Sequence, residues 1–278
     1  MQLYAENPAP ERGFLDDVSG LSQNLDWLVW MPVPITARGD IGIRKRAMRH
    51  LVSAACGIWM ACTAPVTAEP VVVVELYTSQ GCSSCPPADE FVAMLASDPR
   101  ILPLALHVDY WDYIGWADKF AQAKFTDRQR AYAKAIGSRT IYTPQLIIGG
   151  QHRIEGFSPQ ETAARLREHL AAGSTVTLTV TRKGDRLVIR AEADPPLDET
   201  LRIQLVRYKP EETVTIERGE NAGKTISYHN IVTSWEGLGE WEATEPLEMT
   251  APFGGSEPGA VILQTAGPSA ILAAARVD

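Results

Sequence analysis

Two cysteines separated by two serines constrain this 278-residue chain more than any other feature. The pair, Cys82 and Cys85, follows the apolar run 71–77 and precedes the segment 87–96, which has helical periodicity. A strand, a C-x-x-C pair and a helix form the arrangement of a dithiol/disulfide redox site, because the first thiol faces the positive end of the helix dipole, which favours its thiolate. The sequence therefore predicts thiol–disulfide exchange at this pair, the redox-active centre of an oxidoreductase.

The other two cysteines, Cys56 and Cys62, lie in a segment with the form of a secretory signal peptide. A basic stretch at 44–49 precedes an uncharged, mostly apolar stretch at 51–66, and small residues follow. We expect cleavage after Ala68 and a periplasmic or secreted mature protein. The apolar stretch is shorter than the roughly 18–20 residues of a membrane-spanning helix, so an uncleaved signal segment would be the only contact with a membrane.

Secretion signals normally begin at the chain start, yet residues 1–47 precede this one. Met48 is followed by two polar residues and then by the apolar run, so we expect translation to start there and residues 1–47 to be upstream sequence or a disordered extension. Residues 1–68 contain six acidic and six basic residues, so the mature chain keeps the net charge of −8. An acidic secreted chain without basic blocks argues against nucleic-acid binding.

The periodicity of the chain changes near residue 173. Before this point strand and helix patterns alternate, which predicts an α/β domain at 69–172 with a mixed sheet and helices on both faces. After it apolar residues recur with a period of two, which predicts an all-β, sandwich-like domain at 173–278. The expected strands are 71–78, 101–108, 145–148 and 151–156, and the expected helices are 87–96, 126–136 and 159–170.

Three motifs give the chain a resemblance to known proteins. They are GCSSCPPAD at 81–89, HVDYWD at 107–112 and YTPQ at 142–145. With them the chain resembles the thioredoxin fold, and it is similar to a family of secreted bacterial thioredoxin-like proteins known mainly as a domain of unknown function. The resemblance runs from about residue 71 to the C-terminus. It implies a thioredoxin-like fold and secretion, and it supplies no substrate.

The resemblance also implies roles for residues near the cysteines. Thioredoxins place a cis-proline facing the disulfide at the position of Pro144, where it would keep a backbone edge open. An extended substrate peptide would pair with Thr143, and Tyr142 and Trp111 are the other expected substrate-binding residues.

The expected catalytic residues are the two cysteines, Pro144 and one acid. Cys82 would attack as the exposed thiolate and Cys85 would resolve the mixed disulfide. Glu75 lies in a strand whose valines predict burial on both faces, and it looks like the counterpart of the buried acid of thioredoxins. A buried carboxylate there could pass a proton to or from Cys85.

Two regions have competing interpretations. The aromatic, acidic connection 109–125 is either a satellite hydrophobic cluster at one end of the sheet or a lid or groove beside the cysteines. The segment 219–225 looks like a phosphate loop, but it has one residue too few between its glycines and no helix after it. We expect a hairpin turn there.

Two other functions fit the same residues. The chain could be a non-catalytic thioredoxin-fold binding protein with a static disulfide, or a copper metallochaperone that uses the reduced cysteines with His107. Under the enzyme hypothesis the partners are protein or small-molecule thiols and disulfides. No organic cofactor is expected, because the electrons reside in the sulfur pair. The sequence leaves open the redox direction, the substrate and the oligomeric state.

Overall fold

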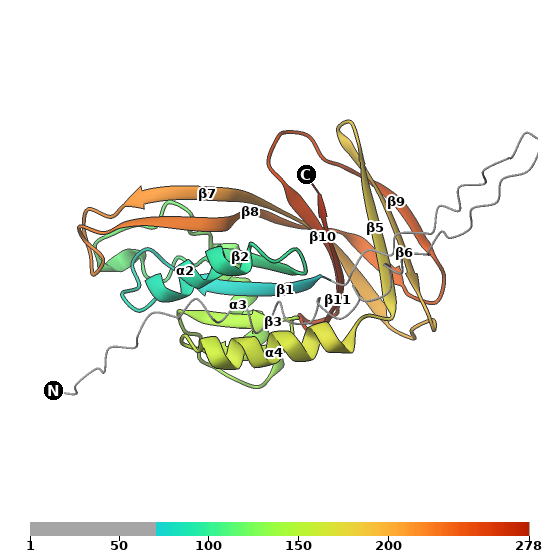
Figure 1. The fold of residues 1–278 in the computed structure, drawn as a ribbon, viewed down its shortest axis with the longest axis horizontal. Helices are drawn as coiled ribbons and strands as arrows, with labels where there is room; N and C mark the ends of the chain where they lie inside the picture. The colour runs from blue at the N-terminus through green and yellow to red at the C-terminus, as the bar shows by residue number, and fades with distance from the viewer. Residues whose placement is uncertain (1–70, 278) are drawn as a thin grey trace, which may run out of the picture. The chain divides into compact units, whose positions relative to one another are not determined.

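A computed structural model describes residues 71–277 of the chain. The expected extension, the signal peptide with Cys56 and Cys62, and the cleavage position after Ala68 lie outside these residues. The described part contains two β-sheets (Figure 1). The larger has eight strands in the order β11-β10-β7-β8-β2-β1-β3-β4, and the smaller has three in the order β5-β6-β9. No helix within residues 71–277 is long and apolar enough to cross a membrane.

The first half alternates strands and helices close to the expected positions. The largest difference is at α3, which begins at Ala123 after the extended residue Gln122 rather than at 126, because alanine and lysine favour the helix and Phe125 is buried on the sheet. The elements in order are β1 (Val72–Thr78), α2 (Pro86–Leu95), β2 (Ile101–His107), the 3₁₀ helix η1 (Asp112–Ile114), α3 (Ala123–Ala135), β3 (Gln145–Ile148), β4 (His152–Glu155) and α4 (Pro159–Ala172).

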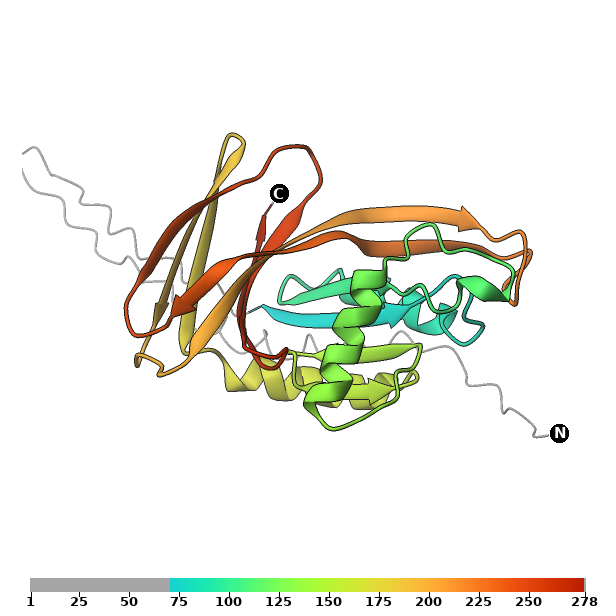
Figure 2. The ribbon, with the colours of Figure 1, turned by 180° about the vertical axis from the view of Figure 1, so that it is seen from behind.

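Alternation along β1 assigns its side chains to two different faces of the sheet. Tyr77 packs in one cluster with Phe125 and Tyr132 of α3, so the odd-numbered side chains of β1 face α3. Helices α2 and α4 lie on the opposite face, as the two views in Figures 1 and 2 show. Thr78 and His107 are register partners in the parallel pair β1–β2 and belong to the α2 face.

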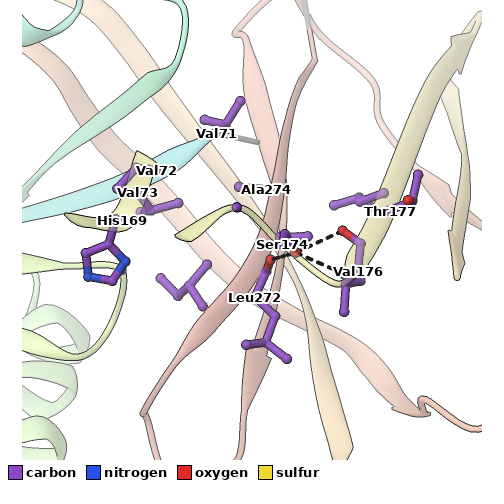
Figure 3. Close-up of a pocket in the computed structure, with 14 residues that line it drawn as sticks. Val71, Val72, Val73, His169, Ser174, Val176, Thr177, Leu272 and Ala274 are labelled. Carbon is purple, nitrogen blue, oxygen red and sulfur yellow. Dashed lines mark hydrogen bonds between the residues drawn. The ribbon is translucent and has the colours of Figure 1, made fainter. Parts of the chain in front are cut away.

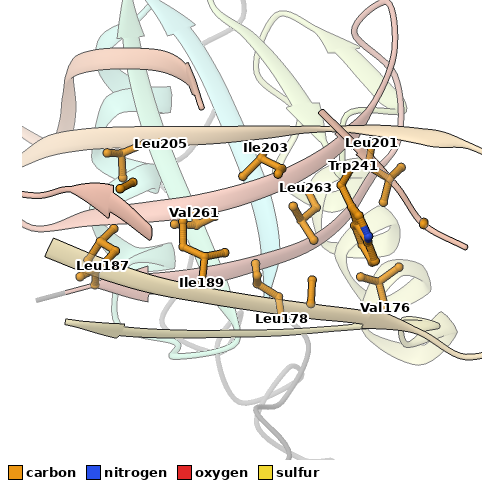
Figure 4. Close-up of a cluster of buried hydrophobic side chains, with 14 of the residues drawn as sticks. Val176, Leu178, Leu187, Ile189, Leu201, Ile203, Leu205, Trp241, Val261 and Leu263 are labelled. Atoms are coloured by element: carbon orange, nitrogen blue, oxygen red, sulfur yellow. The ribbon is translucent and has the colours of Figure 1, made fainter. Parts of the chain in front are cut away.

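The second half supplies strands to both sheets. Its hydrophobic core lies between the three-stranded sheet and the strands β7, β10 and β11 (Figure 4), and fully buried side chains such as Leu187, Ile189 and Leu263 fill it. This is a sandwich-like packing of two sheets. The strands are β5 (Val176–Lys183), β6 (Arg186–Ala193), β7 (Thr200–Thr215), β8 (Thr225–Glu242), β9 (Leu247–Pro252), β10 (Gly259–Thr265) and β11 (Ile271–Val277).

The long antiparallel hairpin β7–β8 connects the two halves of the fold. Its register is irregular between Ile203 and Gln204 and between Arg207 and Tyr208. Strand β8 also pairs with β2, where Ala105 is opposite Ile231. The large sheet therefore contains strands from both sides of the expected domain boundary at residues 172–173. The far end of the hairpin extends along α2 (Figure 1).

Candidate functional site

The two cysteines of the C-x-x-C pair form a disulfide at the start of α2. Their Cα atoms are 5.4 Å apart, and the Cys85 N–H donates to the Cys82 carbonyl at 3.3 Å. Cys85 is the N-cap of α2, and its carbonyl accepts the N–H of Ala88 at 2.8 Å. Pro86 and Pro87 follow in the first turn, where a missing N–H costs little because that group has no partner within the helix.

Both sulfur-bearing residues are buried in the disulfide form. Cys82 is 1% exposed and Cys85 is 0% exposed, whereas the two serines between them are exposed. The expectation that Cys82 is the exposed cysteine is wrong for this form. Two segments that are distant in sequence contact the loop of residues 79–85, the cysteine loop, and account for its burial.

The first of these segments is the aromatic connection that follows β2. The indole N–H of Trp111 donates to the Thr143 hydroxyl at 2.7 Å, and that of Trp116 donates to the Gln80 side-chain oxygen at 2.8 Å. A Cβ at Gly81 would lie 3.2 Å from the Trp111 Cβ, so the connection approaches the loop closely. The structure puts this region beside the loop that holds the cysteines, as the lid-or-groove interpretation predicts, and Trp116 and Phe120 also pack against a buried cluster around Tyr228, as the satellite-cluster interpretation predicts.

The second segment is the turn between β7 and β8. The buried amide of Asn221 donates to the carbonyls of Gln80 at 3.0 Å and Cys82 at 2.9 Å. The Lys224 ammonium donates to the side-chain oxygen of Asn221 at 2.8 Å. Gly219 has a φ of +79°, and a Cβ there would lie 3.3 Å from the Trp116 Cβ. The segment is the hairpin turn that the sequence predicts, but sequence reasoning missed its contact with the cysteine loop.

The Thr143–Pro144 peptide bond is cis, as expected, and so is Asp194–Pro195, which was not predicted. Tyr77 of β1 is paired with Gln145, the residue that follows Pro144, so this segment lies at the same end of the sheet as the cysteines. The Tyr142 side chain is 41% exposed.

The structure separates Glu75 from the cysteines. As an odd-numbered residue of β1 it faces α3, on the side of the sheet away from α2. Arg128 of α3 binds its carboxylate through two hydrogen bonds of 2.7 and 2.9 Å. The hydroxyls of Tyr132 and Tyr77 donate to it at 2.6 and 2.9 Å. This buried carboxylate is fully partnered on the α3 face, so the expected proton exchange with Cys85 has no support in the structure.

A different acid, Asp89, lies on the α2 face. It is 3% exposed, and among residues 71–277 neither carboxylate oxygen accepts a hydrogen bond of normal geometry, although the Thr78 hydroxyl lies close enough to act on it. Burial raises the pKa of Asp89 to about 7, although His107 opposes this effect. Sequence reasoning missed it, but a signal was present, because Asp89 interrupts the apolar stripe of α2 formed by Ala88, Val92 and neighbouring residues.

His107 connects this acid with the aromatic connection. Its Nδ1 lies 2.7 Å from a carboxylate oxygen of Asp118, and its ring packs edge-to-face against Phe120 and Tyr228. Burial alone would raise the pKa of Asp118, but His107 and the N–H groups of Gln80 and Phe120 outweigh it, so that pKa lies below its ordinary value. Asp118 thereby holds both the histidine and the loop before Cys82.

One cavity lies away from the cysteines. It has a volume of about 340 Å³ and is lined by parts of β1, β5, β11 and the end of α4 (Figure 3). Ser174 donates to the Leu272 carbonyl at 2.6 Å, and His169 is hydrogen-bonded to His152 at 2.9 Å, so these two polar side chains already have partners. Residues 71–277 contain no group of three or more His, Cys, Asp and Glu side chains able to hold a metal ion.

The chain is similar to two solved structures and to one described family. Residues 73–264 match the family described as protein of unknown function (DUF1223). A crystal structure of protein AGR_C_4864 from Agrobacterium tumefaciens is 32% identical, with a TM-score of 0.65, over 76% of this chain and 95% of that chain. HBP35 of Porphyromonas gingivalis is 13% identical, with a TM-score of 0.56, over 75% of this chain and 74% of that one. The second likeness concerns the fold alone. No curated protein matches the chain.

Proposed function

The chain belongs to the DUF1223 family of proteins of unknown function, and we propose that this member is a thiol–disulfide oxidoreductase with a thioredoxin-like site. The observation that carries the proposal is the Cys82–Cys85 disulfide at the start of α2, in a loop that Trp111 approaches closely at Gly81. Cys82 is the attacking thiol and Cys85 the resolving one, and partner thiols approach along Thr143 and Pro144.

The small size of the disulfide ring supports a redox role over a structural one. On the chain-entropy model a cross-link between residues three apart removes little entropy from the unfolded chain. The loop is also held independently of the sulfur atoms, because Asn221, Asp118 and Trp116 all bind the residues around Gln80. A disulfide that adds little to stability is better explained by its chemistry.

We further propose that the protein acts in the periplasm or outside the cell. The support is the signal-like segment at 48–68, after which only the cysteine pair remains. In an oxidising compartment such a pair rests as a disulfide. The direction of electron flow then depends on its potential, since known couples range from about −270 mV for reductants to about −120 mV for oxidants.

Trapping of partners tests the enzyme hypothesis. Cys85→Ser should accumulate mixed disulfides on Cys82 in cells, visible as reducible high-mass bands, because the resolving thiol is gone. Cys82→Ser is the matched control and should accumulate none. If both variants give the same bands as the wild type, the oxidoreductase proposal is wrong.

A binding protein with a static disulfide is the second candidate. The observation in its favour is that both cysteines are buried, at 1% and 0% exposure. Titration of the purified protein with glutathione or dithiothreitol, with free thiols counted by alkylation mass, separates the two. An enzyme has a measurable reduction potential in the folded state. A static disulfide stays oxidised until the protein unfolds.

A further inference from the structure

The α2 face of the sheet contains a buried acid, Asp89, that has no role in the exchange reaction proposed above. Asp89 follows Cys85 by four residues in α2, so the two side chains lie on the same face of the helix, one turn apart. The Asp89 N–H donates to the Cys85 carbonyl at 3.1 Å. Both residues are buried, at 3% and 0% exposure.

Asp89 lacks the partners that normally accompany a buried carboxylate. An unpaired ionised carboxylate in an apolar interior is costly, and neither oxygen of Asp89 accepts a hydrogen bond of normal geometry from the described residues. Glu75, equally buried on the other face, has a bidentate arginine and two tyrosine hydroxyls. The comparison indicates that the burial of Asp89, unlike that of Glu75, is not offset by an ion pair with a basic side chain.

The neighbours of Asp89 fit a group that exchanges protons. The Thr78 hydroxyl and His107, on adjacent strands of the α2 face, both act on Asp89 and oppose the rise of its pKa, and Thr78 Oγ1 and His107 Nε2 are buried with no hydrogen bond of normal geometry within residues 71–277. The charged and titratable groups that act on Asp89 or are acted on by it are His107 of β2, Asp118 of the aromatic connection and Tyr228 of β8. Burial raises the pKa of Asp89 to about 7, where a carboxyl can both accept and donate a proton.

We propose that Asp89 exchanges a proton with the sulfur of Cys85 while the disulfide opens and closes, an inference that rests on the proposed oxidoreductase function. In the reductive direction a partner thiolate attacks Cys82, a mixed disulfide forms, and the Cys82–Cys85 bond breaks. Its electron pair leaves on the Cys85 sulfur, and the Asp89 carboxyl protonates it. The partner's second thiolate then releases reduced Cys82, so the partner dithiol is oxidised to a disulfide.

The oxidative direction reverses these steps. Partner disulfide and Cys82 thiolate first give the mixed disulfide. The Asp89 carboxylate then takes the proton of the Cys85 thiol, and the resulting thiolate attacks Cys82 and expels the partner thiolate. In the disulfide form Cys85 is 0% exposed, so a proton carrier inside the protein suits its sulfur better than bulk water.

The two phases of the reaction with an aromatic disulfide test this role directly. Reduced protein and Ellman's reagent first give a mixed disulfide on Cys82, at a rate that depends on reagent concentration. Attack by Cys85 then releases a second coloured thiolate, at a rate independent of concentration. Stopped-flow absorbance from pH 5 to pH 9 resolves both phases.

The second phase should respond to the acid and the first should not. Asp89→Asn should slow the second phase about 100-fold near neutral pH and remove its inflection near pH 7, with the first phase changed less than about twofold. Glu90→Gln, which removes the same charge from the exposed neighbouring residue of α2, is the matched control and should leave both phases unchanged. An Asp89→Asn variant with a wild-type second phase and pH profile overturns the inference.

Failure of the proposed function gives a different result. If wild type and Cys85→Ser release the same single equivalent of thiolate, no exchange occurs and the oxidoreductase proposal itself falls. If Asp89→Asn does not fold, infrared difference spectra of oxidised against reduced wild-type protein replace it. A carboxylic-acid C=O band that changes on reduction near pH 7 supports the proton exchange, and its absence contradicts it.

Discussion

The indole N–H of Trp111 donates to the hydroxyl of Thr143 at 2.7 Å and so joins the aromatic connection to the segment before Pro144. The bond spans the side of the cysteine loop where a partner would approach. The aromatic connection is therefore a movable cover only if this contact can open.

Removing this bond should make the disulfide more accessible. Thr143→Val keeps the shape of the side chain and deletes the acceptor, and a net hydrogen bond of about 1 kcal/mol corresponds to about fivefold faster reduction by dithiothreitol. Thr250→Val, which deletes the acceptor of an exposed hydrogen bond from Arg186 in the three-stranded sheet, should leave the rate unchanged. Equal rates for all three proteins would mean that reductants enter by another route.

Asn221 should matter more than an ordinary turn residue. Asn221→Ala removes the side-chain donor that the carbonyls of Gln80 and Cys82 share, at a cost of about 2 kcal/mol in the free energy of unfolding. Asn221→Asp has nearly the same volume but turns oxygen atoms toward the two carbonyls, so it should cost more than alanine. Urea unfolding of the oxidised proteins measures both, and an aspartate variant as stable as wild type would refute the contact.

Glu75 should prove structural rather than catalytic. Glu75→Gln leaves the Arg128 guanidinium, whose side chain is 12% exposed, without its carboxylate, and breaking such a pair costs about 3–5 kcal/mol. Glu248→Gln, which breaks an exposed pair with Arg190, should change stability little. The rate of disulfide reduction should stay within about twofold of wild type. A large fall in that rate with unchanged stability would show that Glu75 takes part in disulfide exchange.

Asp89 should make the protein less stable as the pH rises. Its pKa is about 7 in the folded state and about 3.9 in an unfolded chain, so between these values the folded state binds more protons. Stability is then highest below pH 4 for this group and falls by about 4 kcal/mol as the pH passes through 7. Urea unfolding at pH 4 and pH 8 should show this loss in wild type and lack it in Asp89→Asn. Parallel losses in both proteins would contradict it.

The secondary structure of the first half could be predicted because its signals are local. Apolar runs and helical spacing depend on neighbouring residues, and strand β3 (Gln145–Ile148) lies where expected. The length of β7 could not be predicted in this way, because the polar stretch around Pro210 interrupts its apolar pattern although the strand continues through it.

The site was predicted only in part because its missing members depend on long-range packing. The period of two shows that Glu75 and Thr78 face opposite sides of the sheet, but not which side α2 covers. Whether Glu75 or Asp89 lies on the same face as the cysteines depends on which face α2 covers. Asn221 had no local signal at all, since its partners are 139 residues away at Cys82.

The contact between Asn221 and Cys82 also implies an order of folding steps during synthesis. Cys82 and Cys85 are neighbours as soon as they emerge from the ribosome, whereas the hairpin that covers them is complete only when β8 has been made. Contacts of such large sequence separation form slowly, and until then the edge of β2 that pairs with Ile231 is open. The nascent chain therefore exposes its dithiol to oxidants before the folded protein conceals it.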